Sequence, residues 1–145
     1  IPATIFPSNA SSGLPALEFL NLENNGLNGT IPVEIGNMTR MYAIHLSNNS
    51  LSGEIPPELA DMGINNIRAK TIKLDGNRFS GSIPPEIGDF NQLYALDLQE
   101  NDLTGMIPEE ICLLHSPEDH TFAVDCGKVE CNCCTPACQD LTNNV

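Results

Sequence analysis

The side chains with catalytic potential do not form a recognisable catalytic motif in this chain of 145 residues. Its histidines, His45, His115 and His120, are not accompanied by a nucleophile in a sharp-turn motif. There is no glycine-rich loop of the kind that cradles phosphate. Carboxylates are so abundant that pairs of them do not by themselves indicate acid–base catalysis. We therefore predict that the chain is not an enzyme and needs no cofactor.

The cysteines are confined to the last third of the chain. They are even in number and absent from the rest of the sequence, which is typical of a disulfide-bonded end in a secreted protein. The sequence does not choose among the possible pairings. The predicted disulfide cysteines are Cys112, Cys126, Cys131, Cys133, Cys134 and Cys138.

Two metal sites are alternatives to this interpretation. Zinc would use Cys131, Cys133 and Cys134 with His115 and His120, but the paired-cysteine knuckles of zinc sites are missing. Calcium would use acidic oxygens near the same end, but no loop alternates oxygen ligands and closes with Gly and Glu. We therefore predict no metal site and a solvated acidic surface. The candidate calcium ligands are Glu109, Glu110, Glu118, Asp119 and Asp125.

Four sequons for N-linked glycosylation begin at Asn9, Asn28, Asn37 and Asn48. The composition gives roughly two by chance, so the excess is modest. We expect these asparagines to be glycosylation sites. They agree with the cysteines in favouring a secreted or cell-surface protein.

The charge of the chain restricts its partners. A net charge of -13 and a pI near 4.2 argue against binding to nucleic acid or to anionic membranes. No apolar run is long enough to span a bilayer, and no signal peptide is present. Because the chain begins with Ile1, we expect it to be a trimmed piece of a longer polypeptide.

A phrase of sixteen residues organises most of the chain and occurs four times, from Leu17, Met41, Ala69 and Leu93. Each copy has apolar residues at steps one, four and six, Asn at nine, Leu or Phe at eleven, Gly at thirteen, and Ile-Pro at the end. Repetition at this period predicts a solenoid. Residues 1–16 have the spacing of a partial preceding repeat, and residues 112–145 form the predicted cysteine-rich cap.

Each step of the phrase has a physical interpretation. The alternating apolar pair at steps four and six predicts a strand, and stacked copies would form a parallel sheet with these side chains inside. The asparagines at step nine can satisfy the backbone of adjacent turns, which predicts an asparagine ladder. The strand pairs begin at Leu20, Ile44, Ile72 and Leu96, and the ladder residues are Asn25, Asn49, Asn77 and Asn101.

The phrase Leu-x-x-Leu-x-Leu-x-x-Asn-x-Leu-x-Gly-x-Ile-Pro resembles the plant-type extracellular leucine-rich repeat, over about three quarters of the chain. The resemblance implies an α/β-type solenoid, a right-handed coil with a parallel concave sheet and a mostly irregular or 3-10 convex side. It also implies ligand recognition, as in receptor ectodomains and secreted inhibitors. The dense cysteine end looks more like secreted algal, diatom-type repeat proteins than like the usual land-plant cap.

The second and third repeats are separated by four extra residues, because the ladder asparagines are spaced 24, 28 and 24 apart. We expect residues 62–69 to form a loop between the convex side and the third strand. Four of the six basic residues lie in or near it: Arg68, Lys70, Lys73 and Arg78. This basic spot on an acidic chain could orient an anionic partner.

The concave face is the predicted binding surface, because strand residues between the inward leucines must face outward. Aromatic anchors concentrate binding energy, and we favour the third and fourth strands as the centre. The predicted ligand-binding residues are Phe19, Tyr42, His45, Lys70, Lys73, Tyr94 and Asp97. The predicted partner is a protein, a peptide or a wall glycan, although the lack of Trp makes a sugar platform the poorer option.

Two other functions are compatible with a solenoid. An uncapped first coil could stack on another molecule and build an extracellular matrix or filament by self-association. A regular polar row could also meet ice or a mineral surface, although Glu54 and Met106 interrupt the neighbouring row. That row would consist of Asn28, Ser52, Ser80 and Thr104.

Overall fold

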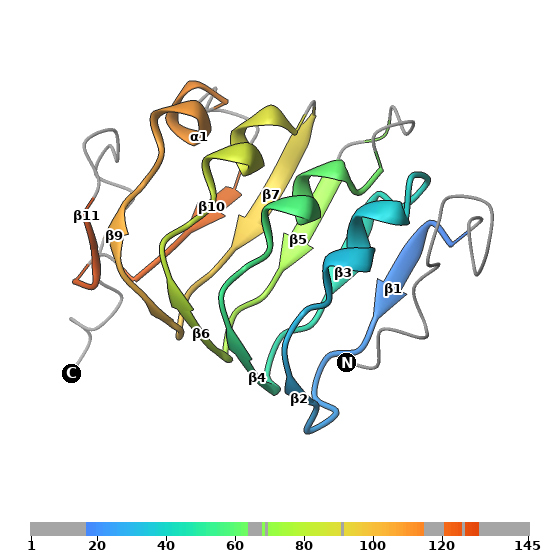
Figure 1. Cartoon of the computed structure of the whole chain (residues 1–145), viewed down its shortest axis with the longest axis horizontal. Helices are drawn as coiled ribbons and strands as arrows, with labels where there is room; N and C mark the ends of the chain where they lie inside the picture. Colours follow the sequence, from blue (N-terminus) through green and yellow to red (C-terminus); the bar gives the residue numbers. More distant parts are fainter. Residues whose placement is uncertain are drawn as a thin grey trace.

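A computed structural model describes residues 17–63, 68, 70–90, 92–114, 121–125 and 127–130. Within them, successive coils stack side by side, each with a strand on one side and a short helix on the other (Figure 1). The predictions for residues 1–16, which include Asn9 and the uncapped first coil, lie outside the described residues. So do those for most of the cap, including His115, His120 and Cys126.

Parallel strands form the concave sheet, in the order β1-β3-β5-β7-β10. The inward residue of each strand pairs with its counterpart, Leu20 with Ile44, Ile44 with Ile72, and Ile72 with Leu96. This register confirms the predicted stacking of the apolar pairs. The strands are β1 (Phe19–Asn21), β3 (Ala43–His45), β5 (Lys70–Lys73), β7 (Leu93–Asp97) and β10 (Thr121–Ala123).

Strand β10 extends the sheet beyond the four predicted repeats. Phe122 pairs with Leu96, and Val124 is buried in the core. The alternation of Phe122 and Val124 is the signal of a strand, but this segment lacks the leucines and the asparagine of the repeated phrase. The predicted cap, residues 112–145, therefore adds a fifth strand to the sheet, and its bounds stay a prediction.

The convex side carries one short helix in each coil, as predicted. Three are 3-10 helices, η2 (Val33–Asn37), η3 (Pro57–Asp61) and η4 (Pro85–Asp89), and the fourth is α1 (Glu109–Leu113). Proline at the first position suits a helix start, where an N-H has no helical partner. The third residue of each helix enters the core: Ile35, Leu59, Ile87 and Ile111.

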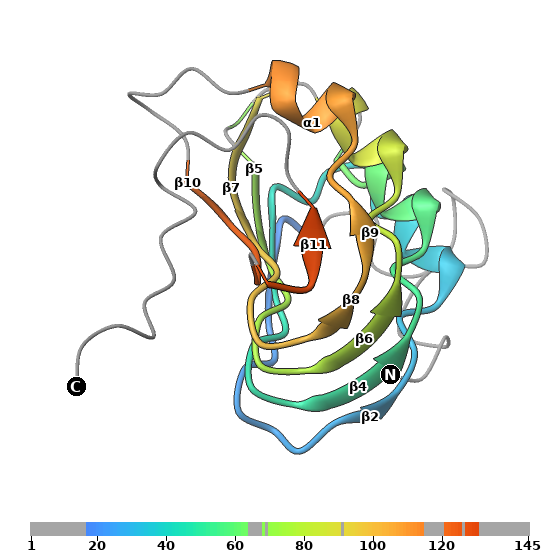
Figure 2. The ribbon, with the colours of Figure 1, turned by 90° about the vertical axis from the view of Figure 1, so that its left-hand side faces the viewer.

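A second parallel sheet, seen edge-on beside the helices in Figure 2, was not predicted. It forms after the apolar residue at step eleven, where the chain leaves each turn in an extended conformation. Its strands are β2 (Asn28–Gly29), β4 (Ser50–Gly53), β6 (Arg78–Gly81) and β8 (Asp102–Leu103). A pair at the far end, β9 (Gly105–Met106) and β11 (Val129–Glu130), is also parallel.

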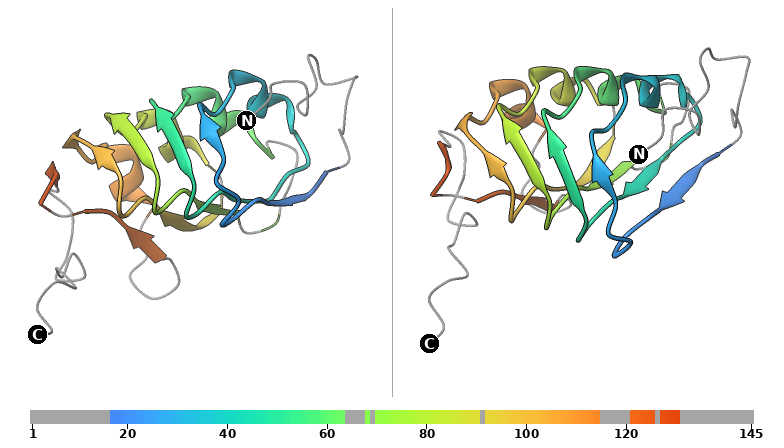
Figure 3. Two further views of the ribbon diagram at one scale, coloured as in Figure 1. Left: turned by 90° about the horizontal axis from the view of Figure 1, so that it is seen from below. Right: turned by 60° about the horizontal axis from the view of Figure 1, so that its bottom comes forward.

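The register of this second sheet shows that the polar row predicted for ice or mineral binding is wrong. Ser52 pairs with Arg78 rather than with Ser80, so each coil is displaced by two residues relative to its neighbour. Ser80 likewise pairs with Asp102 instead of Thr104. The strands fan across this face in Figure 3, and serine stands beside charged residues instead of forming a uniform row.

The asparagine ladder is confirmed in the interior coils. Asn77 Oδ1 accepts the backbone N-H of Leu51 at 3.0 Å, and its Nδ2 donates to Leu46 O and Leu74 O, both at 3.0 Å. Asn101 repeats this pattern one coil further and is 1% exposed. The ladder thus satisfies backbone groups that would otherwise be buried without partners.

Candidate recognition surface

Two rows of outward side chains cross the concave sheet. In the first row, Ala43, Thr71 and Ala95 pair in register on the three central strands, with Phe19 at one end. We call Ala43, Thr71 and Ala95 the small-residue row. In the second row, the paired residues are Asn21, His45, Lys73 and Asp97. Because strand side chains alternate, both rows face away from the leucine core.

The small-residue row lies between larger side chains. On the second and fourth strands, a tyrosine comes directly before the row residue: Tyr42 before Ala43 and Tyr94 before Ala95. The polar residues of the second row come two positions after the row residues. Tyr94 is 49% exposed and Phe19 is 43% exposed, so aromatic surface remains available at two separated places. Ala43 is 4% exposed, whereas Thr71 and Ala95 are half-buried, so the accessible part of the row lies on the third and fourth strands.

Aromatic rings gather on the first two strands rather than on the third and fourth. Phe19 stacks on Tyr42 with ring centroids 6.4 Å apart, and it meets His45 edge-on at 5.0 Å. The guanidinium of Arg68 lies 5.0 Å from the centroid of the Tyr42 ring. The predicted centre on the third and fourth strands therefore lacks this cluster, and Tyr94 stands apart from it.

An ion-pair network fixes the edge of this aromatic cluster. Glu18 forms ion pairs with two arginines. Arg68 Nη1 lies 2.9 Å from Glu18 Oε2, and Arg40 Nη2 lies 3.1 Å from Glu18 Oε1. Exposed pairs of this kind contribute little stability, typically below about 1 kcal/mol each, but they orient Arg68 over Tyr42. Arg40 was not predicted as a site residue, although its position directly before the second repeat placed it beside Glu18.

His45 lies at the centre of the surface in a half-buried position. Its Nδ1 is 3.5 Å from Glu23 Oε1, while Nε2 is out of solvent contact and has no hydrogen-bond partner in the structure. Burial lowers the pKa of His45, Lys73 lowers this pKa further, and Glu23 and Asp75 oppose the shift. The imidazole is therefore biased toward its neutral form.

Charged groups of opposite sign occupy the neighbouring strands. Burial raises the pKa of Asp97, and Asp75 and Glu100 add to this shift, whereas the backbone N-H of Gln99 and the charge of Lys73 oppose it. Asp75 is held in place by Ser47, whose Oγ lies 2.5 Å from Asp75 Oδ1. The polar row thus presents an ordered sequence of a neutral imidazole, a cation and a carboxylate.

Lys70 does not lie on the concave face, so its predicted place among the ligand-binding residues is wrong. Its side chain is 3% exposed and points to the convex side, with Nζ 5.6 Å from the centroid of the Phe90 ring. The cause is the regular alternation of β5, which places Lys70 on the same inward side as Ile72 and pairs it with the inward Leu93. The register shift lies opposite, in β7, where Tyr94 is an extra residue without a counterpart in the third strand.

The predicted modification and metal residues are described only in part. Asn28 and Asn48 are exposed and Asn37 is half-buried, and their glycosylation stays a prediction. Asp125, one candidate calcium ligand, already accepts the backbone N-H groups of Glu100 and Asn101. Among the described residues, no group of three or more His, Cys, Asp or Glu side chains could hold a metal ion. The candidate zinc ligands lie outside the described residues, as do the calcium candidates Glu118 and Asp119.

The geometry defines a class of protein, a parallel-sheet solenoid that presents an ordered concave surface. The Leucine Rich Repeat family matches residues 16–38, 41–62, 68–90 and 92–114, more than half of the chain. The chain belongs to the Leucine Rich Repeat family. A comparison with curated protein sequences gave no significant match.

Solved plant proteins share this fold. The BIR2 ectodomain from Arabidopsis thaliana is 31% identical, with a TM-score of 0.64 over 72% of this chain and 52% of that chain. The plant peptide hormone receptor RGFR1, solved in complex with RGF2, is 37% identical, with a TM-score of 0.63 over 74% of this chain and 17% of that chain. A plant ice-binding protein is 26% identical, with a TM-score of 0.65 over 81% of this chain and 35% of that chain.

The chain therefore spans about half of the BIR2 ectodomain and a smaller share of RGFR1 and of the ice-binding protein. No helix among the described residues is long and apolar enough to cross a membrane. The predicted likeness of the cysteine-dense end to algal, diatom-type proteins stays a prediction, because most of that end lies outside the described residues.

Proposed function

We propose that the chain is an extracellular recognition module that binds an extended peptide across the strands of its concave sheet. The observation that carries this proposal is the small-residue row, Ala43, Thr71 and Ala95, which lies between aromatic and charged side chains. A peptide backbone fits over short side chains, while its own side chains reach the rings on one side and the charges on the other. The proposed contacts are Phe19, Tyr42, His45, Lys73, Tyr94 and Asp97.

The dimensions of the surface favour a peptide over a large protein partner. Five strands spaced about 4.8 Å apart span about 20 Å, the length of about six extended residues. A stable protein interface usually covers about 800 Å² on each side, more than such a ledge provides. The complex of RGFR1 with RGF2 supports the proposal by analogy, since it is a peptide hormone receptor with the same fold.

Secretion is part of the proposal. Disulfide bonding of Cys112 favours an oxidising compartment and supports the proposal of a disulfide-rich end. We further propose that glycans are attached at exposed sequons such as Asn28 and Asn48. Asn48 lies where the second strand ends, so a glycan there would shade the second coil and leave the third and fourth strands open.

Selection from a random peptide library on the immobilised chain would test the concave surface. Enriched peptides should lose at least about tenfold in affinity, about 1.4 kcal/mol, for the variant Ala95→Arg, which fills the row. The control Thr104→Arg adds the same side chain at an exposed residue outside the concave sheet and should bind normally. Failure to enrich peptides, or equal affinity for both variants, would refute the proposal.

A further inference from the structure

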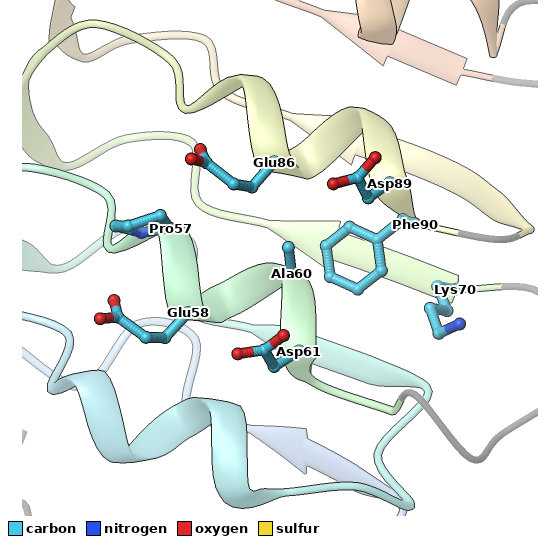
Figure 4. A pocket seen from close by; sticks show the side chains of 8 residues that line it. All are labelled: Pro57, Glu58, Ala60, Asp61, Lys70, Glu86, Asp89 and Phe90. Carbon is cyan, nitrogen blue, oxygen red and sulfur yellow. The ribbon is translucent and has the colours of Figure 1, made fainter.

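A groove of about 480 Å³ lies between η3 and η4, on the face opposite the concave sheet. Its floor is apolar, and Figure 4 shows Ala60 and Phe90 at its centre with carboxylates on both sides. Lys70 lines one end of the groove. The proposed peptide surface does not include this site.

One methyl group explains why the groove forms between these two helices. The fourth residue of each helix faces the next coil, and in η2 and η4 it is glycine. A Cβ at Gly36 would lie 2.8 Å from Glu58 O, and one at Gly88 would lie 2.2 Å from Glu110 Cβ, so these coils are in close contact. In η3 the equivalent residue is Ala60, whose Cβ requires space that glycine does not. The helices η3 and η4 therefore leave a gap that the other pairs close.

The walls of the groove carry unneutralised negative charge. Glu58 and Asp61 come from η3, and Glu86 and Asp89 come from η4. None of the four forms an ion pair or a side-chain hydrogen bond with any residue that the structure describes. In addition, Glu58 Oε2 is shielded from solvent and has no hydrogen-bond partner among the described residues.

The groove already holds one cation against its aromatic floor. The Lys70 ammonium lies near the Phe90 ring although this side chain is 3% exposed. Phe90, Pro57 and Ala60 offer the apolar contact that the methylene stems of lysine and arginine prefer. The carboxylates offer acceptors for the charged heads of such side chains.

We infer that this groove binds an extended segment of a partner protein that carries two consecutive basic residues. A five-residue 3-10 helix is about 10 Å long, which matches about three extended residues. Successive side chains of an extended segment point in opposite directions. One basic side chain therefore reaches Glu58 and Asp61, and the next reaches Glu86 and Asp89. The concave surface stays free to bind a different ligand.

A capped Gly-Arg-Arg-Gly peptide, titrated into the full chain and followed by NMR chemical shifts, tests this inference. Shifts should appear in residues 57–61 and 85–89, and the neutral citrulline analogue should cause none. The double variant Glu58→Gln, Glu86→Gln should weaken binding at least about tenfold, because it removes one charged acceptor from each wall. The matched control Glu34→Gln, Glu109→Gln removes the same charge from η2 and α1 and should bind within about twofold.

The shape of the groove is tested separately by Ala60→Gly. Glycine occupies the equivalent place in η2 and η4, so this variant should fold, and a narrower groove should weaken binding without any change in charge. An absence of shifts with the wild-type chain would overturn the inference. So would equal losses in the two charge variants, which would mean diffuse attraction to an acidic protein, or unchanged binding by Ala60→Gly.

Discussion

The carboxylate of Asp125 accepts the backbone N-H of Asn101 at 3.1 Å. It also accepts the backbone N-H of Glu100 at 3.0 Å. Asp125 thus provides the acceptor for the last coil that an asparagine provides for the coils before it. A residue from beyond the recognisable repeats therefore completes the ladder. Lys128 supports the same end by donating from Nζ to Asn101 O at 2.5 Å.

The first prediction follows from this relationship. Asp125→Ala should lower the free energy of unfolding by about 1–2 kcal/mol, because two backbone donors lose their acceptor at a partly buried site. Urea unfolding followed by circular dichroism measures the loss. Asp61→Ala removes an equal charge at an exposed residue without a described partner and should change the stability by less than about 0.5 kcal/mol. Equal effects in both variants would contradict the role of Asp125.

The second prediction compares two asparagines at the same step of the repeat. Asn101→Ala should cost about 3 kcal/mol or more, since Phe79 N, Leu74 O and Leu98 O all lose their partner in the core. Asn25→Ala should cost less than about 1 kcal/mol, because Asn25 is exposed and its side chain donates only to Glu23 O among the described contacts. Similar urea midpoints for the two variants would show that ladder position does not determine the cost.

The third prediction concerns the close contact between η4 and α1. Gly88→Ala should destabilise the chain by at least about 1–3 kcal/mol, because its Cβ would meet Glu110 Cβ at 2.2 Å. Gly127→Ala is the control, since its Cβ would have no atom within 4 Å. Thermal unfolding of the two variants checks the difference. A stable Gly88→Ala variant would mean that the coils can separate freely.

The fourth prediction is a pH dependence from His45. Burial lowers its pKa below the usual 6.5, so the unfolded chain binds more protons than the folded chain below that pH. The free energy of unfolding should therefore fall as the pH drops from about 7 toward the lowered pKa. His45→Gln should flatten this part of the stability profile. Phe19, Glu23, Lys73 and Asp75 face the ring, and an unchanged pH slope in the variant would assign the dependence to other groups.

The fifth prediction separates the two lysines of β5. Reductive methylation should modify half-buried Lys73 readily and Lys70 slowly, because Lys70 is 3% exposed and the reagent has little access to its amine. Burial lowers the pKa of Lys70, which favours the reactive neutral amine, so a slow rate would report restricted access alone. Mass spectrometry of proteolytic fragments measures the two rates. Comparable rates would show that Lys70 is as accessible as Lys73, which would contradict its inward position.

The sequence predicts the fold well because its signals are local and repeated. Leu20, Ile44, Ile72 and Leu96 share one rung of the sheet, as their spacing indicates. Buried polar groups need partners, so the asparagines identify the ladder equally well.

The candidate site was harder to predict, because it depends on register and on contacts between distant coils. Tyr94 and Lys70 hold the same step of the repeat, but Tyr94 is the extra residue of a register shift in β7, whereas the regular alternation of β5 turns Lys70 inward. Two further contacts also depend on packing rather than on the spacing of residues in the sequence. Phe19 stacks on Tyr42, and Arg68, in the insertion, lies over the Tyr42 ring.

Ala60 has a consequence for the shape of the whole solenoid. Backbone hydrogen bonds fix the strands at about 4.8 Å, so the arc of the molecule depends on how far apart the opposite ends of the coils are held. A glycine at the fourth helical residue lets those ends close, and an alanine spreads them by the width of a methyl group. The choice between glycine and alanine in each coil would therefore change the curvature of the solenoid at one contact between neighbouring coils. The strands would stay in register.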